Sequence, residues 1–251
     1  MNVVFFALVT TAIAAPTELA SVEGANIQRP SWSPDGSHLS YEANFHEEKR
    51  VELWSGDPII KQFSRVLAGR RGPSSLTTGF TKMSSGGQVV HEISFSPATI
   101  GKYVYSASND ALDYDLYISG GSALAPHPAA DGGPAWSPNG MHIAFTSART
   151  GEGDLYLIDI QSIEAPPQQL TNIAGSSELY VSWSADGTSL AFVAHTKSGD
   201  NIWVLSDLSQ QPFRLTAWPG NQIRPTFSPT EKKIAFYANK DDADRFDIYV
   251  S

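Results

Sequence analysis

Few residues in this 251-residue sequence stand at spacings that would support chemistry. The chain has no cysteine, which excludes thiol nucleophiles, thiolate zinc sites and disulfides. Its six histidines lack a metal-binding spacing such as His-x-x-x-His, and we expect most of them to be solvated loop residues. His91 and His127 are the pair that a zinc site assembled across repeats would use. We predict no bound metal and no cofactor.

Carboxylates are the other candidate chemistry, because glycosidases need a pair of them around one substrate. The segments that we expect to form the innermost strands of the fold contain none, and Glu92 stands at the edge of one of them. The acidic run 241–244 lacks the Gly and the distal Glu of a calcium loop. No Gly-x-Ser-x-Gly elbow or phosphate-binding glycine motif occurs. We therefore predict that the protein is not an enzyme, with a carbohydrate-binding or glycan-cleaving protein as the alternative.

The elements that would position such residues come from an internal repeat, in which an aromatic residue followed by Ser recurs at intervals of roughly 41 to 63 residues. We call these aromatic residues the anchors: Trp32, Phe95, Trp136, Trp183 and Phe227. Asp-Gly or Asn-Gly follows three of the anchors, where a tight hairpin needs positive φ. Two short alternating apolar segments come next, such as 143–145 and 154–157, and each predicts a strand.

A fourth, outer strand in each repeat is indicated by a leucine before the next anchor: Leu19, Leu76, Leu124, Leu170 and Leu215. The pattern predicts an all-β fold, a five-bladed β-propeller of four-stranded antiparallel blades, over residues 15–251. The last repeat lacks its fourth strand, and we expect Thr17 to Ser21 to supply it and close the ring. The anchors should fill the layers between blades. Six blades remain the alternative.

The positions three residues before the anchors suggest a binding site, because loops entering the innermost strands gather at one mouth of a propeller channel. These positions hold Arg29, Glu92, Gly133, Tyr180 and Arg224. Arg and Tyr commonly anchor protein interfaces. The predicted partner-binding site comprises Arg29, His91, Glu92, His127, Tyr180 and Arg224. The alternative, that Arg29 and Arg224 pair with Glu23 or another carboxylate, stays open.

The N-terminal segment and the net charge limit location and partners. Residues 1–14 combine an apolar run with small residues at Ala12 and Ala14, which predicts a signal peptide cleaved after Ala14. The formal net charge of -9 argues against binding nucleic acid or anionic lipid. We expect an exported monomer that does not insert into the membrane, in the periplasm or alternatively secreted.

The third repeat resembles that of TolB-like propellers, from Pro134 to Gly140, through Ile143 to Ser147 and Asp154 to Leu157. The resemblance covers nearly all of the chain after the signal peptide and implies a propeller that binds protein partners at its channel mouth. In that family the partners include peptidoglycan-associated lipoprotein, and the propeller helps to maintain the cell envelope. TolB proteins carry an α/β domain ahead of the propeller and usually have six blades. We therefore interpret the chain as a TolB-like propeller without that domain.

Overall fold

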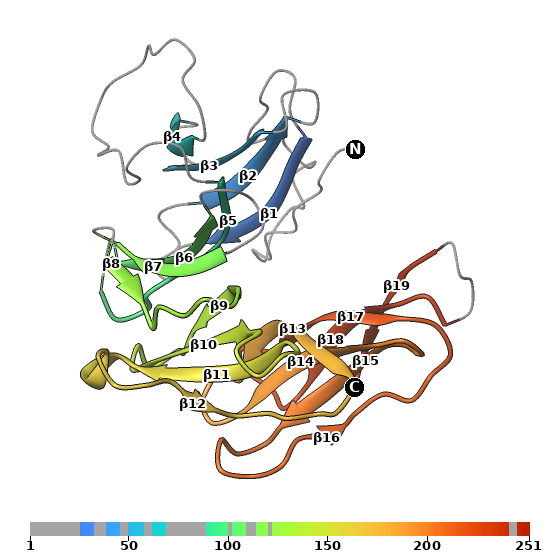
Figure 1. Cartoon of the computed structure of the whole chain (residues 1–251). Helices are drawn as coiled ribbons and strands as arrows, with labels where there is room; N and C mark the ends of the chain where they lie inside the picture. The colour runs from blue at the N-terminus through green and yellow to red at the C-terminus, as the bar shows by residue number, and fades with distance from the viewer. Residues whose placement is uncertain are drawn as a thin grey trace. The chain divides into compact units, whose positions relative to one another are not determined.

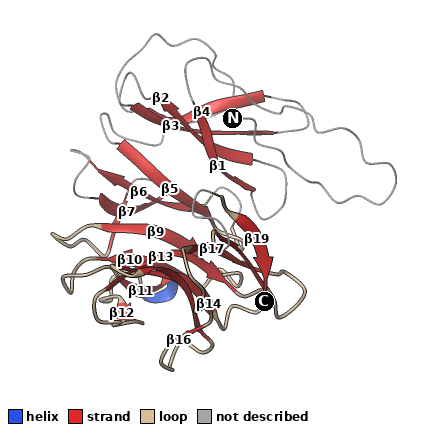
Figure 2. Ribbon diagram, turned by 90° about the vertical axis from the view of Figure 1, so that its right-hand side faces the viewer, coloured by secondary structure: helices blue, strands red, loops and turns tan. Residues whose placement is uncertain are grey.

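The computed structural model describes residues 26–32, 39–45, 50–57, 62–68, 89–99, 102–108, 114–119, 122–240 and 245–251. Regular structure in these residues is β-strand, apart from one 3-10 turn, η1 (Ile160–Ser162), as Figure 2 shows. None of the described segments forms a helix long and apolar enough to cross a membrane. Three predictions lie outside the described residues: the signal peptide, the closing strand Thr17 to Ser21, and the acidic run 241–244.

The chain divides into two compact units, residues 1–90 and 91–251. The first unit holds a four-stranded antiparallel sheet in the order β1 (Asn26–Trp32), β2 (Leu39–Phe45), β3 (Arg50–Asp57) and β4 (Gln62–Ala68). We expected its outer strand near Leu76, and this was wrong. The fourth strand follows the third after a short connection that pairs Asp57 with Gln62, and a short connection costs less closure entropy than a long one.

The second unit holds four further sheets, and its boundary falls within the first strand of the first of them. That sheet runs β5 (Val89–Phe95), β6 (Tyr103–Ser108), β7 (Tyr114–Ile118) and β8 (Ser122–Leu124). The next runs β9 (Asp131–Trp136), β10 (His142–Ser147), β11 (Asp154–Asp159) and β12 (Gln168–Gln169). The third sheet of this unit runs β13 (Ser176–Trp183), β14 (Leu190–Thr196), β15 (Gly199–Leu205) and β16 (Phe213–Arg214). The last runs β17 (Gln222–Phe227), β18 (Ile234–Ala238) and β19 (Asp247–Val250).

Consecutive sheets of the second unit stack face to face, and β13 lies beside both β9 and β17 (Figure 1). Each layer between two sheets is apolar because inward residues of both sheets meet there. Trp136 belongs to one layer and Trp183 to the next, with 7% and 9% of their surfaces exposed. Their predicted role as core residues is confirmed. Of the predicted outer-strand leucines, Leu124 and Leu170 are buried in these layers, and Leu215 is partly buried against the third.

The polar residues after each anchor build the turn into the next strand. In one turn, Ser137 Oγ donates to Asn139 Oδ1 at 2.7 Å, which also accepts the backbone N–H of Met141. In the next repeat Asp186 Oδ1 accepts from Ser184 Oγ at 2.6 Å and from the backbone N–H of Thr188. These hydrogen bonds lower the pKa of Asp186 to about 2. The Ser-x-Asp/Asn-Gly motif of the sequence is therefore a turn-forming motif rather than a chemical one.

Candidate functional site

The first strands of four sheets, β1, β9, β13 and β17, share a register shift, a β-bulge, just before the anchor. The register shifts between Leu179 and Ser182 in β13, and between Ile223 and Thr226 in β17, with corresponding shifts at β1 and between β9 and β10. A bulge inserts one extra residue, bends the strand and re-aims a side chain. The bulged segments contain the positions three residues before the anchors, where sequence reasoning placed the candidate site.

The backbone at three of these positions is left-handed. Gly133, Tyr180 and Arg224 have φ of +59°, +56° and +52°. Glycine adopts this conformation freely, whereas a bulky L-residue pays of order 1 to 3 kcal/mol for it. Tyr and Arg therefore hold these positions against a local conformational cost, and strained residues of this kind cluster at functional sites.

Tyr180 and Arg224 are in contact across neighbouring sheets. The guanidinium carbon of Arg224 lies 4.8 Å from the centroid of the Tyr180 ring, a cation–π stack. Arg224 is exposed and Tyr180 is half-buried against the apolar layer below it. The alternative that Arg224 forms an ion pair with a carboxylate does not hold among the described residues. Glu23, the carboxylate named for it, lies outside the described residues. Among the described residues, the guanidinium of Arg224 interacts with the Tyr180 ring and forms no ion pair.

The other predicted residues are placed as follows. Glu92 donates its backbone N–H to Ser106 Oγ at 3.3 Å, and its Oε2 lies 3.5 Å from where a Cβ on Gly133 would stand. The Glu92 carboxylate thus lies beside the bulge of the next sheet. His127 Nδ1 accepts the backbone N–H of Ala129 at 3.0 Å, which is a local loop contact. Arg29 lies in β1 and His91 in β5, and their side chains lie outside the described part of the structure.

The expectation that the innermost strands lack carboxylates was wrong. These strands begin five to seven residues before the anchor, earlier than the sequence pattern indicated, because the bulge interrupts the alternation that marks them. Asp131 in β9, Glu178 in β13 and Gln222 in β17 each stand five residues before the anchor, and each is at most 1% exposed. Aligning the repeats five residues ahead of the anchor would have revealed this row of polar side chains.

Asp131 is neutralised by an arginine. Arg149 Nη2 lies 3.1 Å from Asp131 Oδ2 and 3.3 Å from Oδ1, while Arg149 Nε donates to Ser147 Oγ at 2.8 Å. Burial raises the pKa of Asp131, although the hydrogen bond from Ser147 and the charge of Arg149 oppose that shift. The carboxylate is therefore part of a buried structural ion pair and is not accessible to a substrate.

No ion pair joins Glu178 to a cation among the described residues. Ser176 Oγ donates to its Oε1 at 2.5 Å and Thr171 Oγ1 to its Oε2 at 2.9 Å. Burial raises the pKa of Glu178 to about 7, the two hydroxyl hydrogen bonds oppose this shift, and the neighbouring Asp154 carboxylate adds to it. Glu178 and Asp154 form a buried acid pair inside the fold. The described residues contain no group of three or more His, Cys, Asp or Glu side chains that could hold a metal ion.

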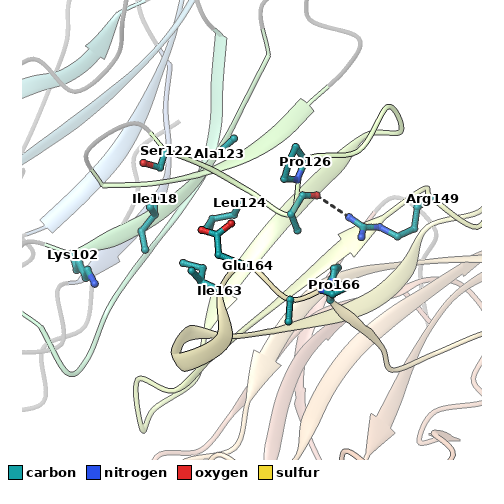
Figure 3. Close-up of a pocket in the computed structure, with 13 residues that line it drawn as sticks. Lys102, Ile118, Ser122, Ala123, Leu124, Pro126, Arg149, Ile163, Glu164 and Pro166 are labelled. Atoms are coloured by element: carbon teal, nitrogen blue, oxygen red, sulfur yellow. Dashed lines mark hydrogen bonds between the residues drawn. The ribbon is translucent and has the colours of Figure 1, made fainter.

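A groove of about 520 Å³ lies between the sheet β5–β8 and the loop that joins η1 to β12 (Figure 3). Prolines and aliphatic side chains line it, including Leu124, Ile163 and Pro166. Arg149 and Lys102 also line the groove, and Arg149 Nη2 donates to the carbonyl of Ala125 at 3.4 Å. None of the predicted site residues lines this groove.

The chain is similar to bacterial propeller proteins. An uncharacterized protein of Agrobacterium fabrum is 26% identical over 235 residues, which cover 88% of this chain and 68% of that protein. TolB from Acinetobacter baumannii superposes with a TM-score of 0.68 at 18% identity, over 94% of this chain and 53% of TolB. A putative TolB from Agrobacterium tumefaciens superposes with a TM-score of 0.62 at 24% identity, over 90% of this chain and 76% of that protein. This chain therefore spans about half the length of the Acinetobacter protein.

An oligogalacturonate lyase in complex with manganese also shares the fold, with a TM-score of 0.63 at 16% identity over 94% of this chain and 64% of the lyase. At these identities the structural likenesses show the architecture alone. The model of the TolB β-propeller domain matches residues 112–251, more than half of the sequence. The chain belongs to the TolB β-propeller domain family.

Proposed function

We propose that this protein is an exported, non-catalytic propeller scaffold that binds a protein partner of the cell envelope at its channel mouth. The observation that carries the proposal is the stacked pair Tyr180 and Arg224 on two neighbouring bulges. Both residues are of the types that anchor interfaces, and both hold a left-handed backbone that costs stability.

Family membership supports the location and the kind of partner. The similarity to TolB proteins is consistent with the periplasm, with secretion as the alternative. The apolar run and small residues within 1–14 support export. The role in envelope maintenance rests on the resemblance to TolB and on the candidate site together.

The absence of catalysis is part of the proposal and is supported by the state of the buried carboxylates. Asp131 is held by Arg149, and Glu178 is fully buried among hydroxyl groups. Neither carboxylate can reach a sugar as glycosidase chemistry requires. The similarity to an oligogalacturonate lyase keeps a glycan ligand as the second candidate function, which reducing-sugar release from pectic and cell-wall glycans would test.

Ring closure is a finer part of the proposal. The sheet β17–β19 has three strands, whereas the other three sheets of its unit have four. We infer that residues 17–21 supply the fourth strand of this sheet and complete five blades. A variant lacking residues 15–22 should show a strongly lowered unfolding midpoint or should aggregate, and an unchanged midpoint would contradict this closure.

The binding proposal is tested by affinity capture from envelope extract of the source organism. The mature protein should retain a partner that mass spectrometry identifies, and Arg224→Ala and Tyr180→Leu should lose it. Arg245→Ala is the matched control, because Arg245 is an exposed arginine paired with Asp247 at 3.0 Å. A partner held equally by all four proteins would place binding elsewhere on the surface.

A further inference from the structure

Among the described residues of the second unit, two arginines lie over tyrosine rings at the same distance. The guanidinium carbon of Arg149 lies 4.8 Å from the ring centroid of Tyr156, and that of Arg224 lies 4.8 Å from the ring centroid of Tyr180. A guanidinium that stacks on an aromatic ring keeps its N–H donors in the plane of the group, directed past the edge of the ring. A guanidinium placed over a ring in this way keeps N–H donors that a planar acceptor such as a carboxylate can meet.

In the Arg149 stack that acceptor is present. Both oxygens of Asp131 lie within 3.3 Å of Arg149 Nη2, and Ser147 Oγ and the carbonyl of Ala125 take further hydrogen bonds. The Tyr156 ring, the Arg149 guanidinium and the Asp131 carboxylate therefore lie next to one another inside the fold. This group shows that an arginine placed over a tyrosine ring binds a carboxylate in this protein.

The Tyr180–Arg224 pair has no such carboxylate among the described residues. Four arginines are described in residues 91–251, and three of them donate hydrogen bonds: Arg149, Arg214 and Arg245. Within the same described residues no hydrogen bond or ion pair is made by the guanidinium of Arg224, although the chain as a whole carries a net charge of -9. Among the described residues, Arg224 is thus an exposed arginine with no carboxylate beside it, and its N–H donors are open to a ligand.

The backbone holds the pair in place. Each residue lies in a bulge, and its strand is paired with the next strand both before and after that bulge. The two side chains are therefore held by regular strands and not by a loop. Preorganised donors lose less conformational entropy when a ligand binds than flexible ones do. Lys could supply the same charge at this position but neither the planar stack nor the paired donors.

We propose that the Tyr180–Arg224 pair is a carboxylate-binding site that accepts an Asp or Glu side chain of the partner. This rests on the proposed function and names the group recognised at that same site. The carboxylate takes the place that Asp131 takes beside Arg149, with the Tyr180 ring behind the guanidinium. The bound segment contributes the acidic residue that this part of the chain does not.

The test uses two fluorescein-labelled six-residue peptides, one with two central glutamates and a twin with two glutamines. Fluorescence anisotropy should show the mature protein binding the glutamate peptide at least about tenfold more tightly than its twin, since charged hydrogen bonds are the stronger kind. Arg224→Lys should remove most of that preference although the charge remains. Tyr180→Phe should keep the preference and Tyr180→Leu should lower it, because the ring and not the hydroxyl forms the stack. Arg245→Lys should match the unaltered protein.

Equal binding of the two peptides by the unaltered protein would overturn the proposal, as would a preference that Arg224→Lys leaves unchanged. Its failure is distinguishable from failure of the scaffold function. If an envelope partner is captured through Arg224 while the two peptides bind alike, the scaffold stands and the carboxylate assignment falls. If the peptide preference depends on Arg224 and no partner is captured, the carboxylate assignment stands and the scaffold function falls.

Discussion

At the scale of single residues, the backbone conformation of the candidate site lowers the stability of the fold. A left-handed Arg224 costs of order 1 kcal/mol, and its stack on Tyr180 returns roughly 0.5 to 1 kcal/mol at an exposed position. The two contributions are of similar size, so the stack adds little net stability, and strained positions of this kind cluster at functional sites. The sequence shows the residue types there but not the strain.

Arg224→Asn should therefore leave the protein equally stable or more stable, by up to about 1 kcal/mol, because Asn tolerates a left-handed backbone. Urea unfolding at neutral pH measures the change, and peptide binding should be lost in the same variant. Arg245→Asn, at an exposed ion pair, should change stability by no more than about 0.5 kcal/mol. A loss of more than about 1 kcal/mol in Arg224→Asn would contradict the strain argument.

The two buried anchor tryptophans differ in their hydrogen bonds. Trp183 Nε1 donates to the carbonyl of Ala135 at 3.0 Å, whereas Trp136 Nε1 is buried without a partner among the described residues. Trp183→Phe should thus lower the free energy of unfolding by about 1 kcal/mol more than Trp136→Phe, because it removes a hydrogen bond, whereas Trp136→Phe removes a buried donor that has no described partner. Chemical denaturation of both variants decides this, and equal losses would mean that the hydrogen bond adds nothing.

At the scale of the elements, the turns between the first and second strands need glycine for two separable reasons. Gly140 and Gly187 have φ of +72° and +71°. A Cβ on Gly140 would stand 2.4 Å from the Cβ of Ala98 in the preceding sheet's turn, whereas on Gly187 the nearest atom is 3.4 Å away. The first turn therefore carries a packing constraint in addition to the backbone one.

Gly187→Ala should cost about 1 to 2 kcal/mol from backbone strain alone, and Gly140→Ala should cost clearly more. Differential scanning calorimetry of both variants supplies the comparison. Similar losses would show that the turn next to Ala98 shifts without cost.

At the scale of the whole molecule, the buried acid pair links stability to pH. The pKa of Glu178 is about 7 in the folded protein and near 4.5 when the group is exposed to water. The folded state therefore binds more protons than the unfolded state between pH 4.5 and 7, and the free energy of unfolding falls as pH rises through that window. The raised pKa of Asp131 acts in the same direction, while the lowered pKa of Asp186 matters only near pH 2 to 4.

Urea unfolding should thus show lower stability at pH 8 than at pH 5, by about 1 to 3 kcal/mol from this group. Glu178→Gln keeps a neutral side chain of similar size and should flatten the dependence. A dependence that persists unchanged in Glu178→Gln would assign it to other groups.

Much of the fold was predictable because the residues that form each repeat recur at similar spacings along the sequence. Aromatic anchors, Asp-Gly turns and alternating apolar segments recur, and each turn closes through its own neighbours, as Ser184 and Asp186 show. The outer strand of the first sheet was misplaced because Leu76 looked like Leu124, while the hairpin at Asp57 and Gln62 was closer. Local patterns predict local structure and leave the choice between two possible partners open.

The candidate site was predicted in part. The repeat placed Tyr180 and Arg224 at equivalent positions of neighbouring repeats, which was enough to predict that they face the same channel mouth but not that they contact each other. His127 was grouped with them on residue type alone, and in the structure its described contact is with its own loop. The burial of Glu178 was not predicted, because it depends on packing within the fold and on a hydrogen bond with Thr171 on the turn before β13.

The amino-acid sequence by itself determined the all-β repeat, the anchors and the family, since each of these depends on contacts within one repeat or on residue patterns. The tertiary structure alone decided which polar residues are free. Asp131 and Arg149 neutralise each other inside the fold, whereas Arg224 meets only a tyrosine ring among the described residues. That difference depends on how neighbouring sheets stack, and no pattern within a single repeat encodes it.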